Sequence, residues 1–389
     1  MIYKTPSLFK SGLRIGVLGG GQLGLMFSQA AISYGLEISI LDPDPNASCR
    51  NISKGFVVGS FLDSETVYQF GKNLDLITIE IENVNIEALL ALEKLGVQVF
   101  PQPHLIQLIQ DKGLQKQFFL DQGIPTAPFR YINSKSQLGE FLNHLPAMLK
   151  LRKGGYDGRG VQLVYDEKTL IEIIKGNFPD SPSILEDLAD FDKEISVMVA
   201  RNRNGEIKSY DPVEMEFNPK MNLVEFLIAP ARISKETSQE AKYLAENIIE
   251  KLGLVGILAV EMFLLKNGDL WVNEIAPRPH NSGHHSIEAC TTSQFDQHLR
   301  AILNLPLGSS KTKIPSVMVN LLGSPGYSGI AKYIGMEEIL GEEGAYLHLY
   351  AKVQTRPYRK MGHITMVNKN LNLAIEKAKK IQNLFKIIA

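Results

Sequence analysis

The sequence has few cysteines, no long apolar run and almost no net charge. Only Cys49 and Cys290 occur among 389 residues, and two cysteines so far apart cannot form a disulfide framework, which suits a reducing compartment. No segment approaches the roughly 18 uninterrupted apolar residues of a membrane span, and residues 1–12 hold no apolar run of signal-peptide length. We therefore expect a cytoplasmic protein that does not associate with membranes.

The charge balance argues against nucleic acid as a partner. The 41 basic side chains are matched by 42 acidic ones, so binding a polyanion would require a local basic cluster. The composition, 44% hydrophobic and 21% charged, is that of a globular protein. Because the chain exceeds the roughly 250–300 residues that one core usually serves, we expect several domains.

The first hundred residues predict alternating strands and helices. An apolar run at 14–18, a glycine-rich loop, a helical stretch to Tyr34 and a second apolar run at 36–41 indicate a β-loop-α-β unit. Further runs at 55–58, 74–81 and 97–100 favour a mostly parallel sheet covered by helices. Pro101 and Pro103 then mark a domain boundary.

The rest of the chain predicts a small α+β domain and two hairpins. A helix is expected at 105–121, followed by short alternating strands and helices. Strand-like runs flank turn residues at 202–205 and again at 266–269, so hairpins are expected at 194–210 and 258–276. After residue 311 come a basic cluster and a Lys-rich terminal helix.

Gly19, Gly21 and Gly24 form the spacing of a dinucleotide-binding loop after a strand. Asp42 closes the second strand, where a ribose-binding acid would stand. Alternatively, the glycines only allow close strand-to-helix packing and expose helix N–H groups to some other anion. Taken alone, the loop leaves a nicotinamide-dependent enzyme open.

A second glycine-rich segment lies at 150–160, between strands expected at 147–149 and 161–164. Four glycines within seven residues favour a mobile hairpin loop whose backbone N–H groups would contact phosphate oxygens. Lys150 and Arg159 would supply neutralising charge. We expect a lid over a triphosphate; the alternative is a solvated surface turn.

Two glutamates fall opposite each other in the second predicted hairpin. A two-residue Asn-Gly turn at 267–268 pairs Leu265 with Leu270 and Glu261 with Glu274. At about 5 Å and an effective dielectric near 20, two carboxylates repel by on the order of 3 kcal/mol, which a divalent cation would relieve. We therefore expect Glu261 and Glu274 to bind Mg²⁺ together with phosphate. The alternatives are one wetted glutamate or a bulge that breaks the register.

The segment at 277–285, Pro-Arg-Pro-His-Asn-Ser-Gly-His-His, has histidines whose spacing suggests zinc. The prolines and Gly283 prevent a helix that would carry His280 and His284 on one face, and the cysteines add no ligands at a recognisable spacing. We expect instead a polar loop beside the metal, with Arg278 stabilising an anion.

Lys352, Arg356, Arg359 and Lys360 place four positive charges within nine residues, interrupted by Pro357. Such a cluster is usually solvated surface. Its extended form and an adjacent Gly-His pair make a phosphate-binding loop an equal alternative.

Five motifs together resemble one enzyme family over almost the whole chain. They are Gly-Gly-Gly-Gln-Leu-Gly at 19–24, Glu-Ile-Glu-Asn-Val at 80–84, Gly-Gly-Tyr-Asp-Gly-Arg-Gly at 154–160, Asn-Glu-Ile-Ala-Pro-Arg-Pro-His-Asn-Ser-Gly-His at 273–284 and Arg-Pro-Tyr-Arg-Lys-Met-Gly-His at 356–363. This set is similar to the 5-(carboxyamino)imidazole ribonucleotide synthases of the ATP-grasp superfamily. The block at 273–284 is the most specific, since generic ATP-grasp enzymes lack it and many place Asn where Ala276 stands.

The resemblance implies an ATP-grasp fold of mixed α/β and α+β class and a dimeric enzyme of purine biosynthesis. MgATP, or its Mn²⁺ counterpart, would phosphorylate bicarbonate to carboxyphosphate, with ADP as product. The carboxyl group, or released carbon dioxide, would pass to the amine of 5-aminoimidazole ribonucleotide, leaving phosphate. The implied domains are a Rossmann-like pre-ATP-grasp domain that does not bind NAD (1–103), the ATP-grasp small domain (104–189), the large domain with the metal site (190–310) and a C-terminal subdomain (311–389).

The resemblance also implies roles for individual residues. Lys150, Glu274 and Arg278 would be catalytic, with Arg278 near the carboxyphosphate, and Glu261 and Glu274 would hold the metal. The residues that would contact ATP are Lys112, Lys150, Gly155, Tyr156, Asp157, Gly158, Arg159, Gly160, Glu186, Asp187, Leu188, Ala189, Glu194, Asn273 and Glu274. The residues that would bound the ribonucleotide are Gln22, Glu82, Tyr156, Asp157, Arg159, Lys352 and Arg359.

Three positions depart from the pattern of the family. Lys112 stands where Arg is common and keeps the charge. Phe217 replaces a His that often follows a Val-Glu pair and affects one nucleotide contact, and Tyr358 stands where Gly is usual and would reshape the phosphate loop.

Two other functions remain open, a nicotinamide-dependent dehydrogenase and a catalytically silent nucleotide-binding regulator. The paired glutamates disfavour both. A dehydrogenase does not need them, and a silent relative would be expected to lose one carboxylate or the basic residues of the lid.

Overall fold

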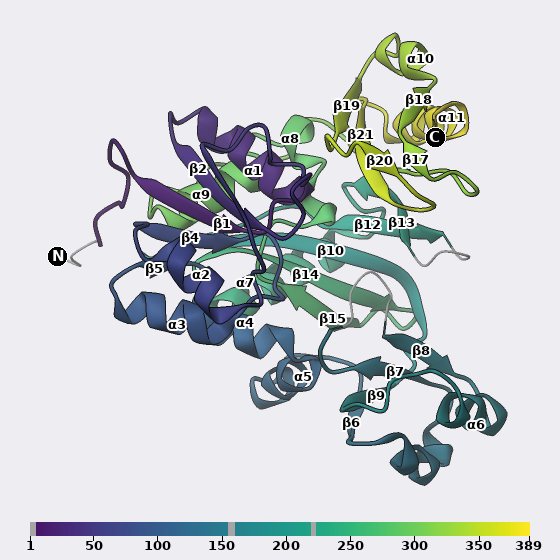
Figure 1. Cartoon of the computed structure of the whole chain (residues 1–389). Coiled ribbons are helices and arrows are strands. Elements are labelled where there is room, and N and C mark those ends of the chain that lie inside the picture. The colour runs from purple at the N-terminus through teal and green to yellow at the C-terminus, as the bar shows by residue number, and fades with distance from the viewer. Residues whose placement is uncertain (1–4, 155–159, 219–222) are drawn as a thin grey trace.

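The computed structural model describes residues 5–154, 160–218 and 223–389, and their strands build three main sheets (Figure 1). One sheet belongs to the N-terminal part, one to the segment before residue 190, and the largest runs through the centre of the molecule to the C-terminal part. None of the described helices is both long and apolar enough to cross a membrane.

The N-terminal sheet has five strands in the order β3-β2-β1-β4-β5, and every pair is parallel. The predicted parallel sheet is therefore confirmed. Its two faces are covered by separate apolar clusters, since Ile15 and Val17 contact one and Leu18 the other. The elements are β1 (Arg14–Leu18), α1 (Gln22–Ile32), β2 (Glu37–Asp42), β3 (Gly55–Val58), α2 (Ser64–Gly71), β4 (Leu76–Ile79), α3 (Ile86–Lys94) and β5 (Gln98–Val99).

The helix predicted at 105–121 is two helices, α4 (Pro103–Gln110) and α5 (Lys112–Asp121). Asp111 separates them with an extended backbone, φ −110° and ψ 106°. Its carboxylate accepts hydrogen bonds from the N–H of Gly113 (2.9 Å) and from Arg152 (2.8 Å). The hydrogen bonds that Asp111 makes as the cap of α5 and with Arg152 stabilise the break more than its helical periodicity stabilises one continuous helix.

The second sheet is antiparallel, in the order β6-β9-β7-β8, and forms the predicted small α+β unit. The helices η1 and α6 cover it around buried Leu138, Leu149 and Leu170. The elements are β6 (Phe129–Ile132), η1 (Lys135–His144), β7 (Ala147–Leu151), β8 (Val161–Val164), α6 (Glu167–Lys175) and β9 (Ser183–Asp187).

The third sheet has nine strands, in the order β15-β14-β10-β12-β13-β16-β21-β19, with β11 beside β10. Both predicted hairpins, β10–β11 and β14–β15, are confirmed. The sheet continues without a break past residue 310, because β13 pairs with β16. Its strands are β10 (Phe191–Arg201), β11 (Ile207–Ser209), β12 (Val213–Asn218), β13 (Leu223–Ala229), β14 (Gly256–Leu265), β15 (Leu270–Ala276), β16 (Ser316–Leu322), β19 (Ala345–Leu349) and β21 (Lys360–Val367).

Helices on this sheet join it to the rest of the molecule. α7 (Lys235–Leu252) buries an apolar stripe, including Leu244 and Ile248, against β10 and β14. α9 (Gln294–Ile302) packs between β14 and α1, and α11 (Leu371–Leu384) covers β16. The smaller elements are η2 (Asn281–Gly283), α8 (Ser286–Ala289), β17 (Gly329–Ile330), β18 (Lys332–Ile334), α10 (Met336–Leu340), β20 (Gln354–Thr355) and β22 (Lys386–Ile388).

Candidate active site

The glycine-rich loop that opens α1 is satisfied by carboxylates of the chain itself. Glu80, which follows β4, accepts hydrogen bonds from the N–H groups of Gly21 (2.6 Å) and Gly24 (2.7 Å). Asp42, at the end of β2, accepts one from Gly20 (2.6 Å). A dinucleotide-binding loop would offer these same N–H groups to a pyrophosphate.

The close approach of Glu80 explains two of the glycines. A Cβ atom at Gly19 would lie 2.4 Å from Cγ of Glu80, and one at Gly21 would lie 2.5 Å from its Oε1. Asp42 is only 8% exposed and points at the loop backbone, so it does not stand free for a ribose. The second interpretation of the loop, close packing with its N–H groups bound to another anion, therefore applies, because an internal carboxylate occupies the anion position at the helix N-terminus.

The two glutamates face each other, but the hairpin reaches this register by another route. Glu261 pairs with Glu274, as predicted. The predicted pairing of Leu265 with Leu270 is wrong, because Leu265 donates its N–H to the carbonyl of Asp269 and leaves a three-residue loop. A bulge between Glu261 and Met262 shifts the register back by one residue, so the alternative of a bulge that separates the glutamates is also wrong.

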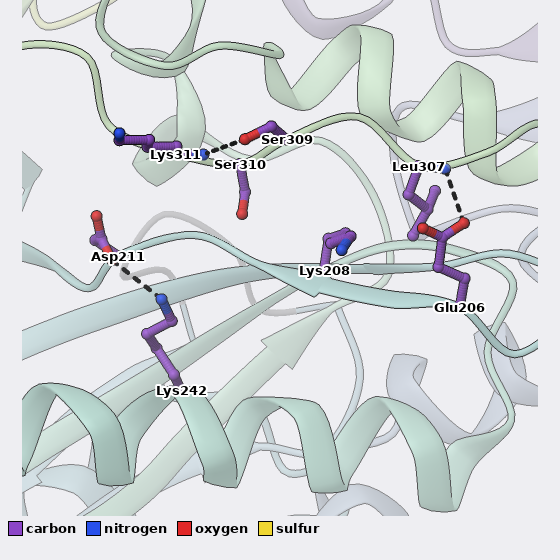
Figure 2. A pocket seen from close by; sticks show the side chains of 8 residues that line it. All are labelled: Glu206, Lys208, Asp211, Lys242, Leu307, Ser309, Ser310 and Lys311. Carbon is purple, nitrogen blue, oxygen red and sulfur yellow. Dashed lines mark hydrogen bonds and ion pairs between the residues drawn. The ribbon is translucent and has the colours of Figure 1, made fainter.

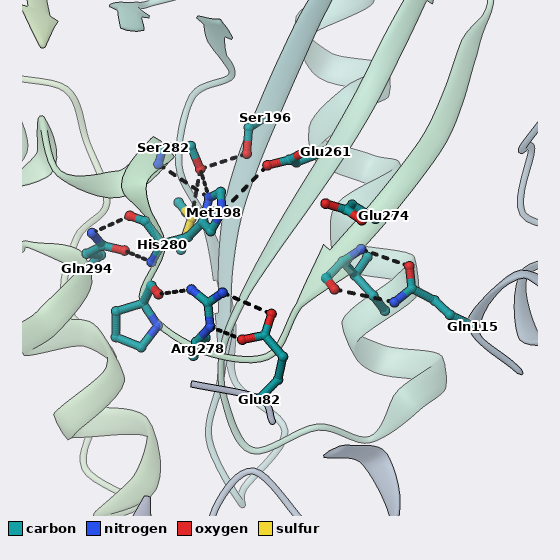
Figure 3. Close-up of polar contacts among 12 residues, drawn as sticks. Glu82, Gln115, Ser196, Met198, Glu261, Glu274, Arg278, His280, Ser282 and Gln294 are labelled. Atoms are coloured by element: carbon teal, nitrogen blue, oxygen red, sulfur yellow. Dashed lines mark hydrogen bonds and ion pairs between the residues drawn. The ribbon is translucent and has the colours of Figure 1, made fainter. Parts of the chain in front are cut away.

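The bulged strand β15 is the edge of the sheet, and neighbouring segments support it. Gln115 accepts a hydrogen bond from the N–H of Ile275 (3.1 Å) and donates to its carbonyl (3.4 Å), as Figure 3 shows. Val272 donates its N–H to the carbonyl of Pro125 (2.8 Å). These contacts satisfy edge groups that would otherwise be exposed, and they hold the backbone beside Glu274 in place.

Positive charge is unevenly distributed around the paired glutamates. Lys112, at the start of α5, forms an ion pair with Glu274, and its charge lowers the pKa of Glu274. Burial, and then the charges of Glu274 and Glu194, raise the pKa of Glu261. Among the described residues, the basic group in contact with Glu261 is Nε2 of His280 at 3.6 Å, and burial lowers the pKa of this imidazole to about 4. Among the described residues, no Lys or Arg forms an ion pair with Glu261.

The pair has the ligand chemistry of a hard divalent cation. Two carboxylates held together against their repulsion are stabilised by such an ion. Within the described ranges, no group of three or more His, Cys, Asp or Glu side chains could hold a metal. Mg²⁺ bound by Glu261 and Glu274 would therefore take its other oxygens from phosphate and water, as this ion commonly does.

A buried carboxylate holds two lysines beside this pair. Glu186 of β9 accepts a hydrogen bond from Nζ of Lys150 (2.9 Å) and lies 3.4 Å from Nζ of Lys116. Burial raises the pKa of Glu186, but the charges of the two lysines outweigh it and leave the pKa lowered. Lys150 also donates to Oδ1 of Asn273 (3.0 Å), the residue next to Glu274. The second sheet thus meets the hairpin through Lys150.

Lys116 and Gln115 are site residues that the sequence analysis missed. Lys116 is 2% exposed and Gln115 3% exposed. A polar residue in a helix is usually solvated, and only the packing of α5 between β9 and β15 shows that these two are not. The polar pair at the centre of a helix expected to be amphipathic was the one available signal.

The other nucleotide-side candidates lie where β9 passes into β10. Asp187 pairs with Arg130 at 2.5 Å, and Leu188 is 43% exposed next to Ala189. Burial raises the pKa of Glu194 to about 7. The charge of Lys150 lowers the pKa of Glu194 and that of Glu274 raises it, so Glu194 shares the field of the paired glutamates.

Phe217 of β12 lies on the same sheet. It is half-buried and packs against a cluster that contains Met215 and Leu227. Phe217 therefore makes an apolar contact at the position where the family pattern often has a histidine.

Arg278 and Glu82 form a bidentate ion pair, with Nε to Oε2 at 2.5 Å and Nη2 to Oε1 at 2.9 Å (Figure 3). Burial raises the pKa of Glu82, but the charge of Arg278 outweighs it and leaves the pKa lowered. Glu82 follows β4 and Arg278 follows β15, so the pair connects the N-terminal part to the hairpin. A guanidinium oriented in this way presents its remaining N–H groups in a fixed direction.

The histidines of the 277–285 segment do not converge on one point. Nδ1 of His280 lies 2.9 Å from Oγ of Ser282, whereas Nδ1 of His284 lies 3.0 Å from Nε2 of Gln294. The ring of His284 packs against that of His363, with centroids 4.7 Å apart. The segment makes only the single turn η2, so it is the expected polar loop beside the carboxylates.

Gln22 and Lys352 meet although far apart in the sequence. Lys352 donates from Nζ to Oε1 of Gln22 (3.0 Å) and to the carbonyl of Lys360 (2.7 Å). Arg359 belongs to the same loop, and its Nη1 donates to the carbonyl of Gln354 (2.8 Å). Tyr358 has φ +64°, a conformation that glycine adopts without steric cost. The geometry explains why glycine suits this position.

The lid candidates Gly155, Tyr156, Asp157, Gly158 and Arg159 lie outside the described residues. Lys150 pairs with Val161 across β7 and β8, so the hairpin predicted to carry the lid is confirmed. Gly160 has φ +70°, and a Cβ atom there would lie 2.8 Å from Cδ1 of Leu151.

Three family models match consecutive parts of the chain. A ribonucleotide synthetase preATP-grasp domain matches residues 13–110, an ATP-grasp domain matches residues 117–295, and a phosphoribosylaminoimidazole carboxylase C-terminal domain matches residues 316–377. The architecture of mixed α/β and α+β parts is thus that of an ATP-grasp protein.

Relatives and solved structures are similar over nearly the whole chain. The N5-carboxyaminoimidazole ribonucleotide synthase of Bacillus subtilis is 38% identical over 367 residues, 93% of each chain. The N5-carboxyaminoimidazole ribonucleotide synthetase structure from Thermotoga maritima has a TM-score of 0.87 at 43% identity and covers 97% of this chain and 99% of that one. The Aspergillus clavatus synthase with ADP and 5-aminoimidazole ribonucleotide has a TM-score of 0.86 at 34% identity and covers 95% and 98%. The chain spans about two thirds of the phosphoribosylaminoimidazole carboxylases of Ogataea methanolica and Vigna aconitifolia.

Proposed function

The chain belongs to the N5-carboxyaminoimidazole ribonucleotide synthase family of ATP-grasp ligases, and on this premise we propose that it carboxylates 5-aminoimidazole ribonucleotide at the expense of ATP. Bicarbonate attacks the γ-phosphorus of ATP, which gives carboxyphosphate and ADP. The carboxyl carbon then passes to the amine of the ribonucleotide, directly or as carbon dioxide, while the bond to phosphate breaks and the amine loses a proton. The observation that carries the proposal is the cross-strand pair of Glu261 and Glu274 beside Lys112 and Lys150.

The nucleotide would lie between the second sheet and the hairpin β14–β15. Lys150 bridges these two parts and would neutralise phosphate oxygens, as would Lys112 once it exchanges Glu274 for them. Asn273 stands beside Glu274 on the same bulge. Glu186, Asp187, Leu188 and Ala189 would border the adenine, Glu194 the ribose, and residues 155–160 would close the site as a lid.

Magnesium would be held by Glu261 and Glu274, the pair whose mutual repulsion supports the assignment. When bound, the ion would neutralise charge on the transferred phosphoryl group. The residues of the chain orient the reactants around it. Mn²⁺ satisfies the same oxygen ligands.

Arg278 would stabilise the carboxyphosphate, because Glu82 holds its guanidinium in a fixed direction. Glu82 then contributes by positioning Arg278 as well as by bordering the ribonucleotide. The ribonucleotide side would further include Gln22, Lys352, Arg359 and the lid residues Tyr156, Asp157 and Arg159. The contact of Lys352 with Gln22 supports a common site from the two ends of the chain.

The proposal extends to a homodimer in the cytoplasm. The dimer follows from the family resemblance alone. The cytoplasm is supported by Cys49 and Cys290, which are both free and buried.

The experiment that tests this function is phosphate release from ATP, measured with and without bicarbonate and 5-aminoimidazole ribonucleotide. We expect release to require Mg²⁺ and to be stimulated by the ribonucleotide, with one carboxylated product per ADP. Reduction of NAD(P)⁺ without consumption of ATP would favour the dehydrogenase. Binding of ATP with no turnover under any of these conditions would favour a silent regulator.

A further inference from the structure

Groups from different parts of the chain contact the ammonium of Lys352. Its Nζ donates to Oε1 of Gln22 (3.0 Å) and to the carbonyl of Lys360 (2.7 Å). The same Nζ lies over the ring of Tyr350, 5.4 Å from the ring centroid. An ammonium within about 6 Å of the centroid of a tyrosine ring is attracted by the negative face of that ring. Tyr350 therefore acts on a residue assigned to the ribonucleotide side, although it has no assigned role itself.

Tyr350 is fixed in the core. It follows β19, is 1% exposed and belongs to the apolar cluster that covers one face of the N-terminal sheet. Its N–H donates to the carbonyl of Met361 (2.9 Å), and its hydroxyl lies 2.9 Å from Nδ1 of His363. Burial raises the pKa of the hydroxyl of Tyr350, so the ring stays uncharged. Backbone and side chain thus both hold the ring in one orientation.

Two further histidine rings pack against the imidazole that contacts this hydroxyl. The centroid of the His363 ring lies 4.5 Å from that of His348, with 9° between the ring planes, and 4.7 Å from that of His284. Nε2 of His348 lies 2.7 Å from Oε1 of Glu288. Burial lowers the pKa of His284 and of His363, so these two imidazoles stay neutral. The histidines therefore support Tyr350 through packing and one hydrogen bond.

The backbone between the ring and the ammonium has a rare conformation. Ala351 has φ +54°, in the left-handed region that residues other than glycine seldom adopt. A residue persists in such a conformation where the surrounding contacts hold it there. On either side of Ala351 these are the contacts of Tyr350 and of Lys352. The turn at Ala351 is thus part of the arrangement that brings the ring and the ammonium together.

An uncharged ring suits a lysine that binds an anion. A carboxylate beside an ammonium orients it but also repels an incoming phosphate. The face of a neutral ring attracts the ammonium and does not reduce its charge. The long stem of a lysine otherwise samples many rotamers, and a side chain that is ordered before the ligand arrives lowers the cost of binding.

We propose that Tyr350 is a positioning residue for the ribonucleotide: its ring, supported by His363 and the two histidines packed against it, orients Lys352 toward the anionic group of that substrate. This inference rests on the proposed function, which assigns Lys352 to the ribonucleotide side. Because Tyr350 acts through Lys352, its effect is on the affinity for the ribonucleotide and not on the affinity for ATP.

The test compares two rings of nearly the same shape in place of Tyr350. Tyr350→Phe keeps a ring with a negative face, whereas a phenylalanine with a fully fluorinated ring, introduced at the same position, reverses the charge distribution of that face. Isothermal titration calorimetry with 5-aminoimidazole ribonucleotide, in the presence of MgADP, measures the affinity. Thermal unfolding checks that the two rings pack equally well.

We expect Tyr350→Phe to bind the ribonucleotide within about threefold of the wild type, because the contact with the cation remains. The fluorinated ring should bind it roughly 3- to 30-fold more weakly than Tyr350→Phe, which is the range of one cation–π contact. Rings with fewer fluorine atoms should give intermediate affinities. The affinity for MgADP should be the same throughout the series.

The same exchange of rings in a Lys352→Met background shows whether the ring acts through the lysine. Methionine keeps most of the length of the lysine side chain without its charge, so the plain and the fluorinated ring should then bind the ribonucleotide equally. A merely structural role of Tyr350 would give the same difference between the rings with and without Lys352, and that result would overturn the inference.

The matched control is the same exchange at Tyr210, which is also 1% exposed. Its hydroxyl donates to the carbonyl of Thr292 (3.0 Å). Tyr210 stands next to Asp211, which lines a polar cavity formed by residues outside the proposed site (Figure 2). Plain and fluorinated rings at this position should bind the ribonucleotide alike. An equal loss of affinity at both tyrosines would overturn the inference, because the effect would then be one of a fluorinated core.

Failure of this inference and failure of the proposed function give different results. If the wild type binds the ribonucleotide and the plain and fluorinated rings at Tyr350 give equal affinities, the inference is wrong and the proposed function stands. If the wild type does not bind the ribonucleotide, the proposed function is wrong and the inference is wrong with it.

Discussion

The glycine-rich loop of α1 and the hairpin β14–β15 both bring carboxylates into contact with groups that a ligand could use. At the loop, Glu80 and Asp42 point at backbone N–H groups, and each donor has its acceptor within 2.6–2.7 Å. At the hairpin, Glu261 and Glu274 are cross-strand partners, and among the described residues only Glu274 of the two forms an ion pair with a lysine. The loop is complete without a ligand, whereas at the hairpin Glu261 has no lysine or arginine partner among the described residues.

This difference shows that a motif in the sequence does not by itself make a ligand-binding site. The spacing of Gly19, Gly21 and Gly24 is that of a dinucleotide loop, but a helix N-terminus attracts an external anion only while no internal one occupies it. The glutamate pair has no such named spacing. It still has the stronger claim to be a site, because two adjacent carboxylates are both ionised only when a cation lies beside them.

The largest expected effect comes from a substitution in the glutamate pair of the hairpin. Glu274→Gln removes half of the proposed metal clamp, so ADP formation should fall by more than about a thousandfold at saturating Mg²⁺, as expected when a charge clamp on a transferred phosphoryl group is lost. Steady-state ADP release, with circular dichroism to check the fold, measures this. Glu216→Gln is the control, since Glu216 pairs with Arg232 on the same sheet. Near-normal turnover of Glu274→Gln would mean that the pair has no catalytic role.

The next largest effect comes from a substitution at the glycine-rich loop of α1, where each N–H donor already has an acceptor. Glu80→Ala leaves the N–H groups of Gly21 and Gly24 without their acceptor, which should cost about 2–4 kcal/mol of the free energy of unfolding. The vacated helix N-terminus should then take an anion, so sulfate should restore part of the loss. Urea unfolding with sulfate or chloride at equal ionic strength measures both.

The control for this variant is Asp63→Ala, which also removes a carboxylate from a helix N-terminus, where it accepts the N–H of Thr66. Its donor is exposed to water, so the loss should be smaller and should not depend on sulfate. If sulfate stabilises both variants equally, the loop of α1 is not a specific anion position.

A smaller effect is expected in the basic loop that contains Arg359, where positive side chains take the place of the carboxylates. If Arg359 binds the 5′-phosphate, Arg359→Ala should weaken binding of the ribonucleotide by about 1.5–3 kcal/mol, roughly 10- to 150-fold in its KM. The KM for ATP serves as the internal control and should stay unchanged. Steady-state kinetics with each substrate varied in turn measures this. An unchanged KM for the ribonucleotide would mean that this loop is solvated surface and does not bind the phosphate.

The smallest effect is a dependence on pH. Burial raises the pKa of Glu80, so the folded state holds this proton at pH values where the unfolded state has lost it. The contribution of Glu80 to the free energy of unfolding should therefore decline as pH rises above the ordinary pKa of a glutamate, and Glu80→Gln should lack this contribution. The stability deficit of Glu80→Gln against wild type should thus shrink from pH 4.5 to 7. A deficit that grows over this range would contradict the direction given for Glu80.

The hairpin illustrates how far pattern reasoning reaches. The pairing of Glu261 with Glu274 was predicted from an Asn-Gly turn, yet the turn has three residues and the register returns only through a bulge at Asn273. The extra residue in the turn and the extra residue at the bulge offset each other, so Glu261 and Glu274 still pair. Alternation along the strands indicates which residues share a face, but it does not report a bulge. Here Gln115 and Lys150 form hydrogen bonds with the residues beside the bulge.

The sequence by itself determined the elements that depend on local periodicity and turn chemistry. These are the parallel strands of the first hundred residues, the two hairpins and the strands on either side of the proposed lid. It also indicated the paired glutamates, because cross-strand neighbours follow from a nearby turn.

Only the tertiary structure decided which charges are compensated. Glu80 reaches a loop almost sixty positions earlier, Lys116 and Lys150 converge on Glu186, and Lys352 meets Gln22 from the other end of the chain. The helix at 105–121 broke for the same reason, since Asp111 meets Arg152. Hydrogen bonds and ion pairs act over a few ångströms of space whatever the separation along the chain, so no local pattern records them.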